Sequence, residues 1–268
     1  MLTAVDHILL QVSDVTSAAA TYERLGFHVS LVESSGSVVE SAYIVFDDFY
    51  LQLREGGPFE GLSEVALRSD DLEAEVARVK SAGFEVTDIA DDPVDGDVGT
   101  LSRRRATIDL ATRVGLVQHD HDSGARLAYL GGRHAHPNTA TALERTYVAV
   151  EDIERDLRVF ESVFGKPAPE PEIGTVIMSL MSVFYFGDIG IAVAEPRGPG
   201  PTADALEANG PGLFQVLFRG QHLDEAAGII TANGGPAPQR GTRLSGESAL
   251  LNLPESACGA YVALAGPA

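Results

Sequence analysis

His7 is the residue whose type and setting first point to chemistry. It stands within LTAVDHILLQV, residues 2–12, an apolar segment typical of a β-strand. Imidazole is a common metal ligand, but a histidine in a strand can equally be a polar residue packed among apolar neighbours. Glu64 raises a similar question, because a carboxylate within SEVALR costs free energy to bury unless it is paired or ligated. It can also lie in solvent at the start of its strand.

Acidic residues outnumber basic ones by 39 to 19 in a chain of 268 residues, for a formal net charge of −20. We therefore expect no nucleic-acid partner, since phosphates require a basic patch. The one basic cluster, Arg103–Arg105, is expected to be a sheet face or an anion contact in a pocket. No apolar run approaches the roughly 20 residues of a membrane helix, and no signal-peptide pattern is seen, so we expect no membrane partner. The single cysteine, Cys258, fits a reducing cytoplasm, where we expect the protein to be located.

The elements around His7 recur four times along the chain. In the first copy, a strand over 5–12 leads through Ser13 and Asp14 to a helix over 15–25, which Gly26 ends. Three extended segments, HVSLVE, SAYIVFD and FYLQLRE, complete a βαβββ unit. The other copies begin with SEVALRSDD, RTYVAVED and QVLFRGQ, and each continues into a helix and a glycine. The spacing is nearly constant: 19 residues from His7 to Gly26, 19 from Glu64 to Gly83, 20 from Arg145 to Gly165 and 19 from Gln215 to Gly234.

A segment rich in Gly, Pro, Asn and Thr, GGRHAHPNTATA, separates the second copy from the third. It predicts a first domain over 1–130, a linker over 131–142 and a second domain over 143–268. The repeat leaves open which units pair, because unit one can pair with unit two or with unit four.

With these motifs the chain resembles the vicinal oxygen chelate superfamily, which includes glyoxalase I, extradiol dioxygenases, fosfomycin-resistance enzymes and bleomycin-binding proteins. The resemblance is carried by VDHILLQVSDVTSAAATYERLGF, YLQLRE, VALRSDDLEAEVARVKSAGF and YVAVEDIERDLRVFESVFG. GLVQHD followed by HPNTATALERTYVAVED is similar to the glyoxalase-like branch. The resemblance implies an α+β fold in which four βαβββ units form two cup-shaped incomplete barrels. It also implies a monomer or homodimer, because two tandem halves supply the paired units that shorter relatives obtain by dimerising.

In that superfamily the metal is held by first-strand and last-strand residues of two paired units. By position, the resemblance implies His7, Gln52 and Glu64 as metal ligands, with Gln118 as a further ligand or a substrate contact. A divalent ion (Fe, Mn, Ni, Co or Zn) suits such donors and would polarise a carbonyl or enediolate oxygen, or bind dioxygen if it were iron. The set departs from the usual one, because it has one histidine, one carboxylate and two uncharged amides. Glu64 would have to serve as ligand or as catalytic base. We expect no organic cofactor.

An alternative register follows from the alternation of side chains along a strand. If His119 rather than Gln118 faces the cup, then His119 joins His7 as a catalytic or ligating residue. Tyr50 and Arg54 share the face of Gln52 and would contact the substrate, Tyr50 by stacking or hydrogen bonding and Arg54 by binding a carboxylate or phosphate. Both can equally be residues at the rim of the core.

The matching positions in the second half are Arg145, Ala192, Gln215 and Ala263. Two alanines cannot ligate a metal ion, so we expect a non-metal copy. Either it is structural, which we favour, or Arg145 fills the vacated position and holds an anion.

Two functions are therefore considered. The first is a metal-dependent enzyme of the lyase, isomerase or dioxygenase type, acting on a small oxygenated organic molecule in the N-terminal cup. The alternative is a metal-free small-molecule binding or resistance protein, or a non-metal catalyst, that uses the same cup. The weakly charged ligand set favours this alternative, and in both cases the partner is a small molecule.

Overall fold

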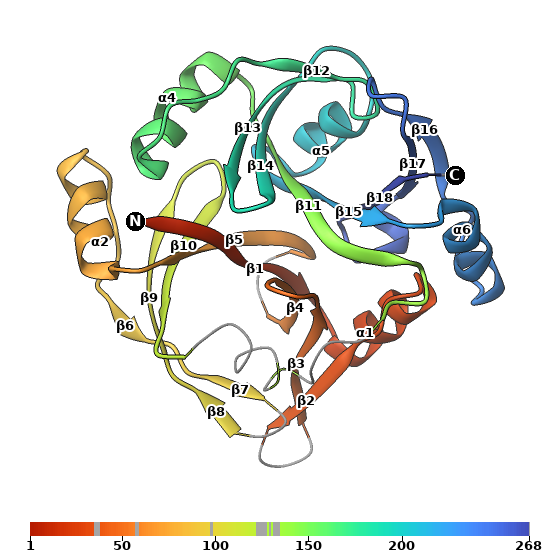
Figure 1. Ribbon diagram of the computed structural model, residues 1–268, viewed down its shortest axis with the longest axis horizontal. Coiled ribbons are helices and arrows are strands. Elements are labelled where there is room, and N and C mark those ends of the chain that lie inside the picture. Colours follow the sequence, from red (N-terminus) through yellow and green to blue (C-terminus); the bar gives the residue numbers. More distant parts are fainter. Residues whose placement is uncertain are drawn as a thin grey trace.

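Two eight-stranded sheets, one in each half of the chain, form the frame of the molecule (Figure 1). The computed structural model describes residues 1–34, 38–56, 59–96, 99–121, 128, 130 and 135–267. The first sheet has the strand order β2-β3-β4-β1-β5-β10-β9-β6, and the second has the order β12-β13-β14-β11-β15-β18-β17-β16. Each sheet curls around its own interior (Figure 1). The chain is therefore an α+β protein with two cup-shaped halves, as predicted.

The strands of the first half, in chain order, are β1 (Leu2–Val12), β2 (Ser30–Ser34), β3 (Val38–Val45), β4 (Tyr50–Glu55), β5 (Gly61–Ser69), β6 (Ala90–Asp91), β9 (Arg103–Asp109) and β10 (Arg113–His119). A separate hairpin is formed by β7 (Val94–Gly96) and β8 (Gly99–Leu101). Those of the second half are β11 (Ala140–Ala149), β12 (Glu172–Gly174), β13 (Ser179–Phe186), β14 (Ile189–Pro196), β15 (Gly212–Gly220), β16 (Gln239–Thr242), β17 (Ser248–Asn252) and β18 (Tyr261–Gly266). The repeat thus predicts both sheets.

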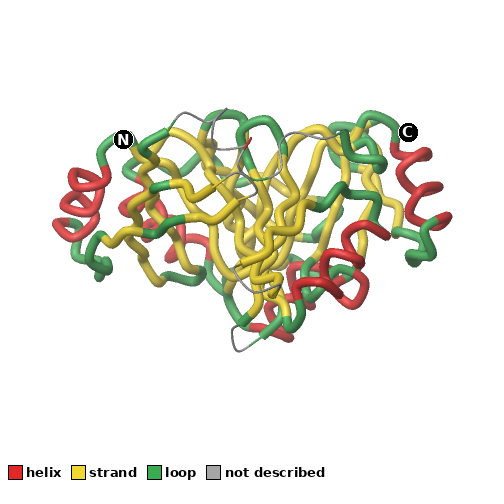
Figure 2. Tube along the Cα trace, turned by 90° about the horizontal axis from the view of Figure 1, so that it is seen from below, coloured by secondary structure: helices red, strands yellow, loops and turns green. Residues whose placement is uncertain are grey.

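The helices are α1 (Val15–Arg24), α2 (Leu72–Ser81), α4 (Ile153–Phe164), α5 (Pro201–Asn209), α6 (Leu223–Ala232) and the short 3-10 helix η1 (Pro254–Ser256). Helices α1, α2, α4 and α6 lie around the outside of the two sheets (Figures 1 and 2). In contrast, α5 lies within the curl of the second sheet (Figure 1), where its Ala205 packs against residues of the inner face. The carboxylates of Asp14, Asp71 and Asp152 each accept a backbone N–H in the first turn of α1, α2 and α4, which fixes where these helices begin. The recurring pattern does not include α5. The residues RGPGP, 197–201, are typical of a connector rich in turns, yet Pro201 begins a helix.

The pairing of the units is settled by the centre of each sheet. β1 pairs with β5 and β11 with β15, in both cases antiparallel, so unit one pairs with unit two and unit three with unit four. Side chains on the outer faces pack against the helices in one large hydrophobic cluster that includes both halves. Phe27 and Phe218 meet in it across the two halves, with ring centroids 5.2 Å apart. The inner faces of the strands are left to form two separate interiors.

Two helix contacts join the halves at opposite sides of the molecule. The Arg78 guanidinium on α2 donates to the carbonyls of Ser162 and Val163 at the end of α4, at 2.8 and 2.6 Å. A cation is favourable at a helix C-terminus, where carbonyls lack partners. On the other side, Asn233 after α6 donates to the carbonyl of Glu23 on α1 at 3.3 Å. Within the described ranges, no helix is long and apolar enough to span a membrane.

Candidate functional site in the first cup

A β-bulge in β1 turns two consecutive side chains toward the interior of the first cup. The register of β1 against β5 shifts between Val5 and His7. Val5 and Ile8 both pack in the core beneath the helices, so Asp6 and His7 share the inner face. A carboxylate and an imidazole that are neighbours in sequence therefore meet on one side of the strand.

Asp6 is fully buried and bridges two histidines. Its Oδ2 lies 2.8 Å from Nδ1 of His7, and its Oδ1 lies 3.0 Å from Nε2 of His119. Nε of Arg68 approaches the same Oδ1 at 3.4 Å. A neutral His7 that donates from Nδ1 to this carboxylate keeps Nε2 as its acceptor nitrogen. His119, the histidine of the alternative register, thus lies in the same cluster as His7.

The ring of His7 is neutral at neutral pH. Burial lowers its pKa from 6.5 to about 4, against the raising effect of the hydrogen bond to Asp6. The charges of Arg103 and Arg105 lower this pKa further. The ring stacks on Tyr50, with centroids 4.9 Å apart and planes 10° from parallel. His7 therefore presents an uncharged imidazole close to two cations.

Glu64 forms an ion pair with Arg105 inside the cup. Its side chain is only 1% exposed, and burial raises the pKa of its carboxyl against the attraction of Arg105. Oε2 accepts from Nη2 of Arg105, while Oε1 has no hydrogen-bond partner among the described residues. A side-chain carbon at Gly115 on the neighbouring β10 would collide with Oε1. The glycine therefore makes the space into which this carboxylate folds.

Arg103 lies two residues before Arg105 on β9, on the same face of the strand, and its side chain is 4% exposed. Its Nη1 donates to the hydroxyl of Tyr50 at 2.8 Å, and its Nη2 lies 2.6 Å from Oδ2 of Asp92. Arg104, between them, points the other way and pairs with Glu73 on α2. Both predictions for the basic cluster are therefore met in part, since two of its arginines lie inside the cup and one lies on the outer face.

Tyr50 and Arg54, the two predicted substrate contacts on β4, have different surroundings, and Gln52, the predicted metal ligand, lies between them in sequence. Tyr50 is buried between His7 and Arg103, whereas Arg54 is exposed near the end of the strand. Gln52 is 8% exposed, and its Nε2 donates to the hydroxyls of Ser41 and Tyr43 at 3.2 and 3.5 Å. Tyr50 and Gln52 therefore lie within the cup, and Arg54 does not join them.

Gln118 lies on the outer face of β10, against the start of α2. Its Oε1 accepts from the backbone N–H of Leu72 at 3.2 Å and from Arg104 at 2.8 Å. Val114 and Leu116, two and four residues before it, belong to the core beneath the helices. His119 therefore faces the cup in place of Gln118, as in the alternative register.

The strand register also identifies the true counterpart of Gln52. Leu9, two residues after His7, lies opposite Gln52, and Ala66, two residues after Glu64, lies opposite Gly115. The position assigned to Gln118 is thus taken by a glycine. The four matching positions of the first cup are His7, Gln52, Glu64 and Gly115.

These residues do not fit the metal site that the resemblance implies. Gly115 offers no donor atom, Gln52 offers a neutral amide, and the charge of Glu64 is matched by Arg105. A divalent cation would also be repelled by the guanidinium groups that already lower the pKa of His7. Across the parts of the chain that the structure describes, no three His, Cys, Asp or Glu side chains are grouped so that they could hold a metal ion.

The second cup repeats the architecture with different residues. The register of β11 against β15 shifts between Leu143 and Arg145, so Glu144 and Arg145 stand where Asp6 and His7 stand in the first. Two residues beyond the positions of Arg145 and Gln215, the register pairs Tyr147 with Ala192 and Leu217 with Ala263. Arg145, Ala192, Gln215 and Ala263 are therefore the matching set, as predicted.

Sequence reasoning missed Asp6 and Gly115. Asp6 adjoins His7, and only the bulge reveals that both side chains face inward. Gly115 makes its contribution by having no side chain, and no residue-type pattern points to it. Arg103 and Arg105 were signalled by the basic cluster, but not their ion pairs with Asp92 and Glu64.

Comparison with known proteins agrees with this architecture. Residues 4–103 match the sequence model of the Glyoxalase/Bleomycin resistance protein/Dioxygenase superfamily. Among curated proteins, a search found no significant match. Solved structures share the fold over nearly the whole chain, at identities that speak for the fold alone.

A manganese(II)-bound glyoxalase from Novosphingobium aromaticivorans is 16% identical, with a TM-score of 0.69 over 98% of this chain and 82% of that one. A mutant of 4-hydroxymandelate synthase from Streptomyces coelicolor is 15% identical, with a TM-score of 0.66 over 100% of this chain and 94% of the other. A hypothetical protein from Staphylococcus aureus is 10% identical, with a TM-score of 0.64 over the full length of both chains.

Proposed function

We propose that the first cup, most of which lies within residues 4–103 that match the Glyoxalase/Bleomycin resistance protein/Dioxygenase superfamily, binds a small oxygenated organic molecule, and that it does so without a metal ion. The observation that carries this proposal is the ion pair of Glu64 with Arg105. A carboxylate that ligates a metal ion must have its negative charge available to that ion, whereas the charge of Glu64 is already neutralised by the guanidinium of Arg105. The binding of oxygen atoms then falls to N–H and O–H donors of the protein.

The donors in the cup suit a molecule that carries both carbonyl and hydroxyl oxygens. Arg103 and Arg105 present planar N–H donors that bind carbonyl, carboxylate or phosphate oxygens. Nε of Arg105 is buried without a partner among the described residues, and so are the acceptors Oε1 of Glu64 and Nδ1 of His119. A buried donor or acceptor without a hydrogen bond lowers the stability of the fold by about 1–3 kcal/mol. A ligand with one acceptor and one donor would satisfy atoms of both kinds.

Apolar walls favour a ligand with a hydrophobic or planar part. Tyr43 and Tyr50 belong to a separate hydrophobic cluster of the first half. Its other members are Val32, Val45, Leu130, and Val94 and Leu101 of the β7–β8 hairpin. Polar groups that stand beside an apolar surface are typical of small-molecule sites. This mixture supports a binding or resistance protein more than a metal enzyme.

A second candidate function, proton transfer on the bound molecule, is favoured by the Asp6–His7 pair. Asp6 fixes His7 with Nε2 as acceptor, so the ring can take a proton from a carbon beside a carbonyl group. The carbonyl oxygen would gain the negative charge, and an arginine N–H donor can stabilise it. Exchange of that C–H proton for deuterium in D2O, followed by NMR, tests this candidate, and wild-type exchange no faster than that of His7→Gln would exclude it.

Binding is tested by thermal melting with EDTA present and with mandelate, pyruvate, catechol and hydroxyacetone as probes. We expect at least one probe to raise the melting temperature of the wild type. Arg103→Met should abolish the shift, and Gln52→Leu, a milder change in the same cup, should reduce it. Gln118→Ala, on the outer face of the neighbouring strand, is the matched control and should keep it. Stabilisation that appears only with added metal ions, or with no probe at all, would overturn the proposal.

A further inference from the structure

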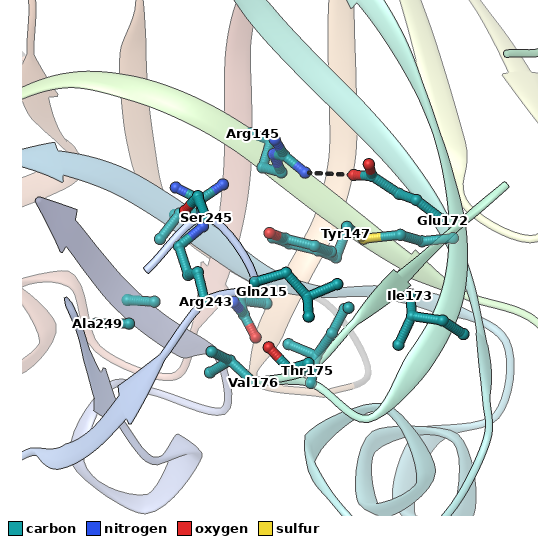
Figure 3. Close-up of a pocket in the computed structure, with 16 residues that line it drawn as sticks. Arg145, Tyr147, Glu172, Ile173, Thr175, Val176, Gln215, Arg243, Ser245 and Ala249 are labelled. Atoms are coloured by element: carbon teal, nitrogen blue, oxygen red, sulfur yellow. Dashed lines mark ion pairs between the residues drawn. The ribbon is translucent and has the colours of Figure 1, made fainter. Parts of the chain in front are cut away.

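The second cup contains a cavity of about 260 Å³ (Figure 3). Arg145, Gln215 and Ala263, three of the four residues that match the first-cup positions, line it. The fourth, Ala192, is buried in the same cluster of inner-face residues. Alanine at two of these positions leaves space that longer side chains would fill. The cavity is therefore the counterpart of the first-cup site, with a different set of polar residues.

Two buried polar atoms of the side chains that line the cavity lack hydrogen-bond partners among the described residues. Gln215 is 2% exposed, and its Oε1 has no hydrogen bond within the described part of the chain. Arg145 is 7% exposed, and its Nε also has no hydrogen bond to the described residues. Both side chains reach into the cavity from neighbouring strands, with the hydroxyl of Tyr147 beside them (Figure 3). The open N–H of Arg145 requires an acceptor, and the open end of the Gln215 amide offers either its oxygen or, when the amide is turned, its N–H to the same ligand.

The charges around the cavity favour an anionic head group. Arg145 and Arg243 share one carboxylate, that of Glu144, whose side chain is 13% exposed, at 3.2 and 2.6 Å. The other carboxylates that reach them, Glu172 on Arg145 and Glu247 on Arg243, are 60% and 50% exposed and stand at the rim. The three least exposed charged groups are therefore two cations, Arg145 and Arg243, and one anion, Glu144, which together carry a net positive charge. Burial raises the pKa of Tyr147 to about 12, so its hydroxyl stays protonated and uncharged.

The remaining walls are apolar and suit a hydrophobic body. Ile177, Met181 and Leu217 are buried along the cavity. At its mouth, Ile173 and Leu244 are 50% and 70% exposed, which is unusual for large apolar side chains. The volume lies just below the usual range of small-ligand sites, roughly 300–1,000 Å³, so the ligand must be small.

From these observations we infer that the second cup binds a small monocarboxylate with an apolar body, its carboxylate facing Arg145 and Gln215. A guanidinium is well matched to a carboxylate. The amide N–H of Gln215 can donate to the same group, since the two ends of an amide can exchange places. This site is independent of the one proposed in the first cup, because it uses other residues in the other sheet.

The test is calorimetric titration of the full chain with benzoate, phenylacetate and 3-methylbutanoate, and with benzamide as the neutral analogue of benzoate. We expect at least one acid to bind, and benzamide to bind at least tenfold more weakly than benzoate. Arg145→Met and Gln215→Leu should each weaken binding at least tenfold, and Ala263→Leu should block it by filling the cavity. Arg240→Met, which removes an exposed arginine of the same half paired with Asp224, should leave binding unchanged.

Circular dichroism of each variant separates loss of the site from loss of the fold. If Arg145→Met does not fold, Gln215→Leu and Ala263→Leu still decide the result, since both keep the charges in place. The inference is overturned if no acid binds, or if the acids bind these variants as tightly as the wild type. It is also overturned if binding is lost in Arg103→Met but not in Gln215→Leu, which would place the carboxylate in the first cup.

Discussion

Glu64 on β5 and Arg105 on β9 form an ion pair across the interior of the first cup, with β10 lying between their two strands. A Cβ at position 115 on β10 would collide with Oε1 of Glu64, so the glycine at this position leaves room for the carboxylate. The positive charge that a bound metal ion would supply at this position is thus supplied by the protein. This relationship underlies the proposal of a metal-independent site.

Replacing Glu64 with Gln should lower the free energy of unfolding by about 2 kcal/mol, because it leaves the charge of Arg105 without its partner in a mostly buried place. Urea unfolding at neutral pH measures the change. Glu73→Gln is the matched control: it removes an exposed partner of Arg104 and should have little effect, as is usual for surface pairs. A Glu64→Gln variant as stable as the wild type would mean that the pair does not stabilise the fold.

His7 should make the protein less stable as the pH falls from neutral toward 4. The folded state holds its pKa at about 4, while the unfolded chain protonates near 6.5. Between these values the unfolded state binds more protons, so the free energy of unfolding decreases on acidification. The difference amounts to roughly 3 kcal/mol in total. Urea unfolding at several pH values should give a shallower dependence for His7→Gln, and parallel curves for both proteins would contradict the prediction.

Gly115→Ala should destabilise the protein by about 1–3 kcal/mol, as overpacking of a core does. The added methyl group meets both Oε1 of Glu64 and the side chain of Ala66. Gly228→Ala, in the exposed middle of α6, has open space around it and should stabilise by up to about 1 kcal/mol. Chemical unfolding of the two variants gives the comparison, and equal effects of the two would argue against the packing of Glu64 described here.

Gln118→Ala should lower stability by about 1 kcal/mol, since it removes an acceptor for a backbone N–H at the start of α2. It should leave ligand binding in the first cup intact, because the side chain lies on the outer face. His119→Ala should impair that binding. The contrast is read from the same melting experiments with probe ligands. A binding defect in Gln118→Ala equal to that in His119→Ala would mean that Gln118, too, contributes to the site.

The fold was predictable because it repeats. Strand, cap, helix and glycine recur at nearly equal spacing, and the aspartates before α1, α2 and α4 mark the same boundary each time. The helix α5 lies outside this repeat and carries a Pro- and Gly-rich start, so local residue types pointed to a connector. Which units pair depends on long-range strand contacts that a repeat pattern does not contain.

The site was predictable only in part, because strand register is not visible in residue types. In the second half, counting along the chain found Ala192 and Ala263 correctly. In the first half the same counting chose Gln118, although the strand contacts place Gly115 in that position. The bulge that turns Asp6 inward is likewise a property of the pairing between two strands. Charges that neutralise one another across strands, such as Glu64 and Arg105, are far apart in sequence and have no local signature.

Metal analysis tests the metal-independent character of the first cup most directly. The protein is expressed in medium containing Fe, Mn, Ni, Co and Zn, purified without chelators and dialysed, and its metal content is measured by mass spectrometry for the wild type and for His7→Gln. We predict far less than one ion per chain in both proteins, and no rise in melting temperature when these ions are added. One tightly held ion per chain in the wild type, lost in His7→Gln, would contradict it.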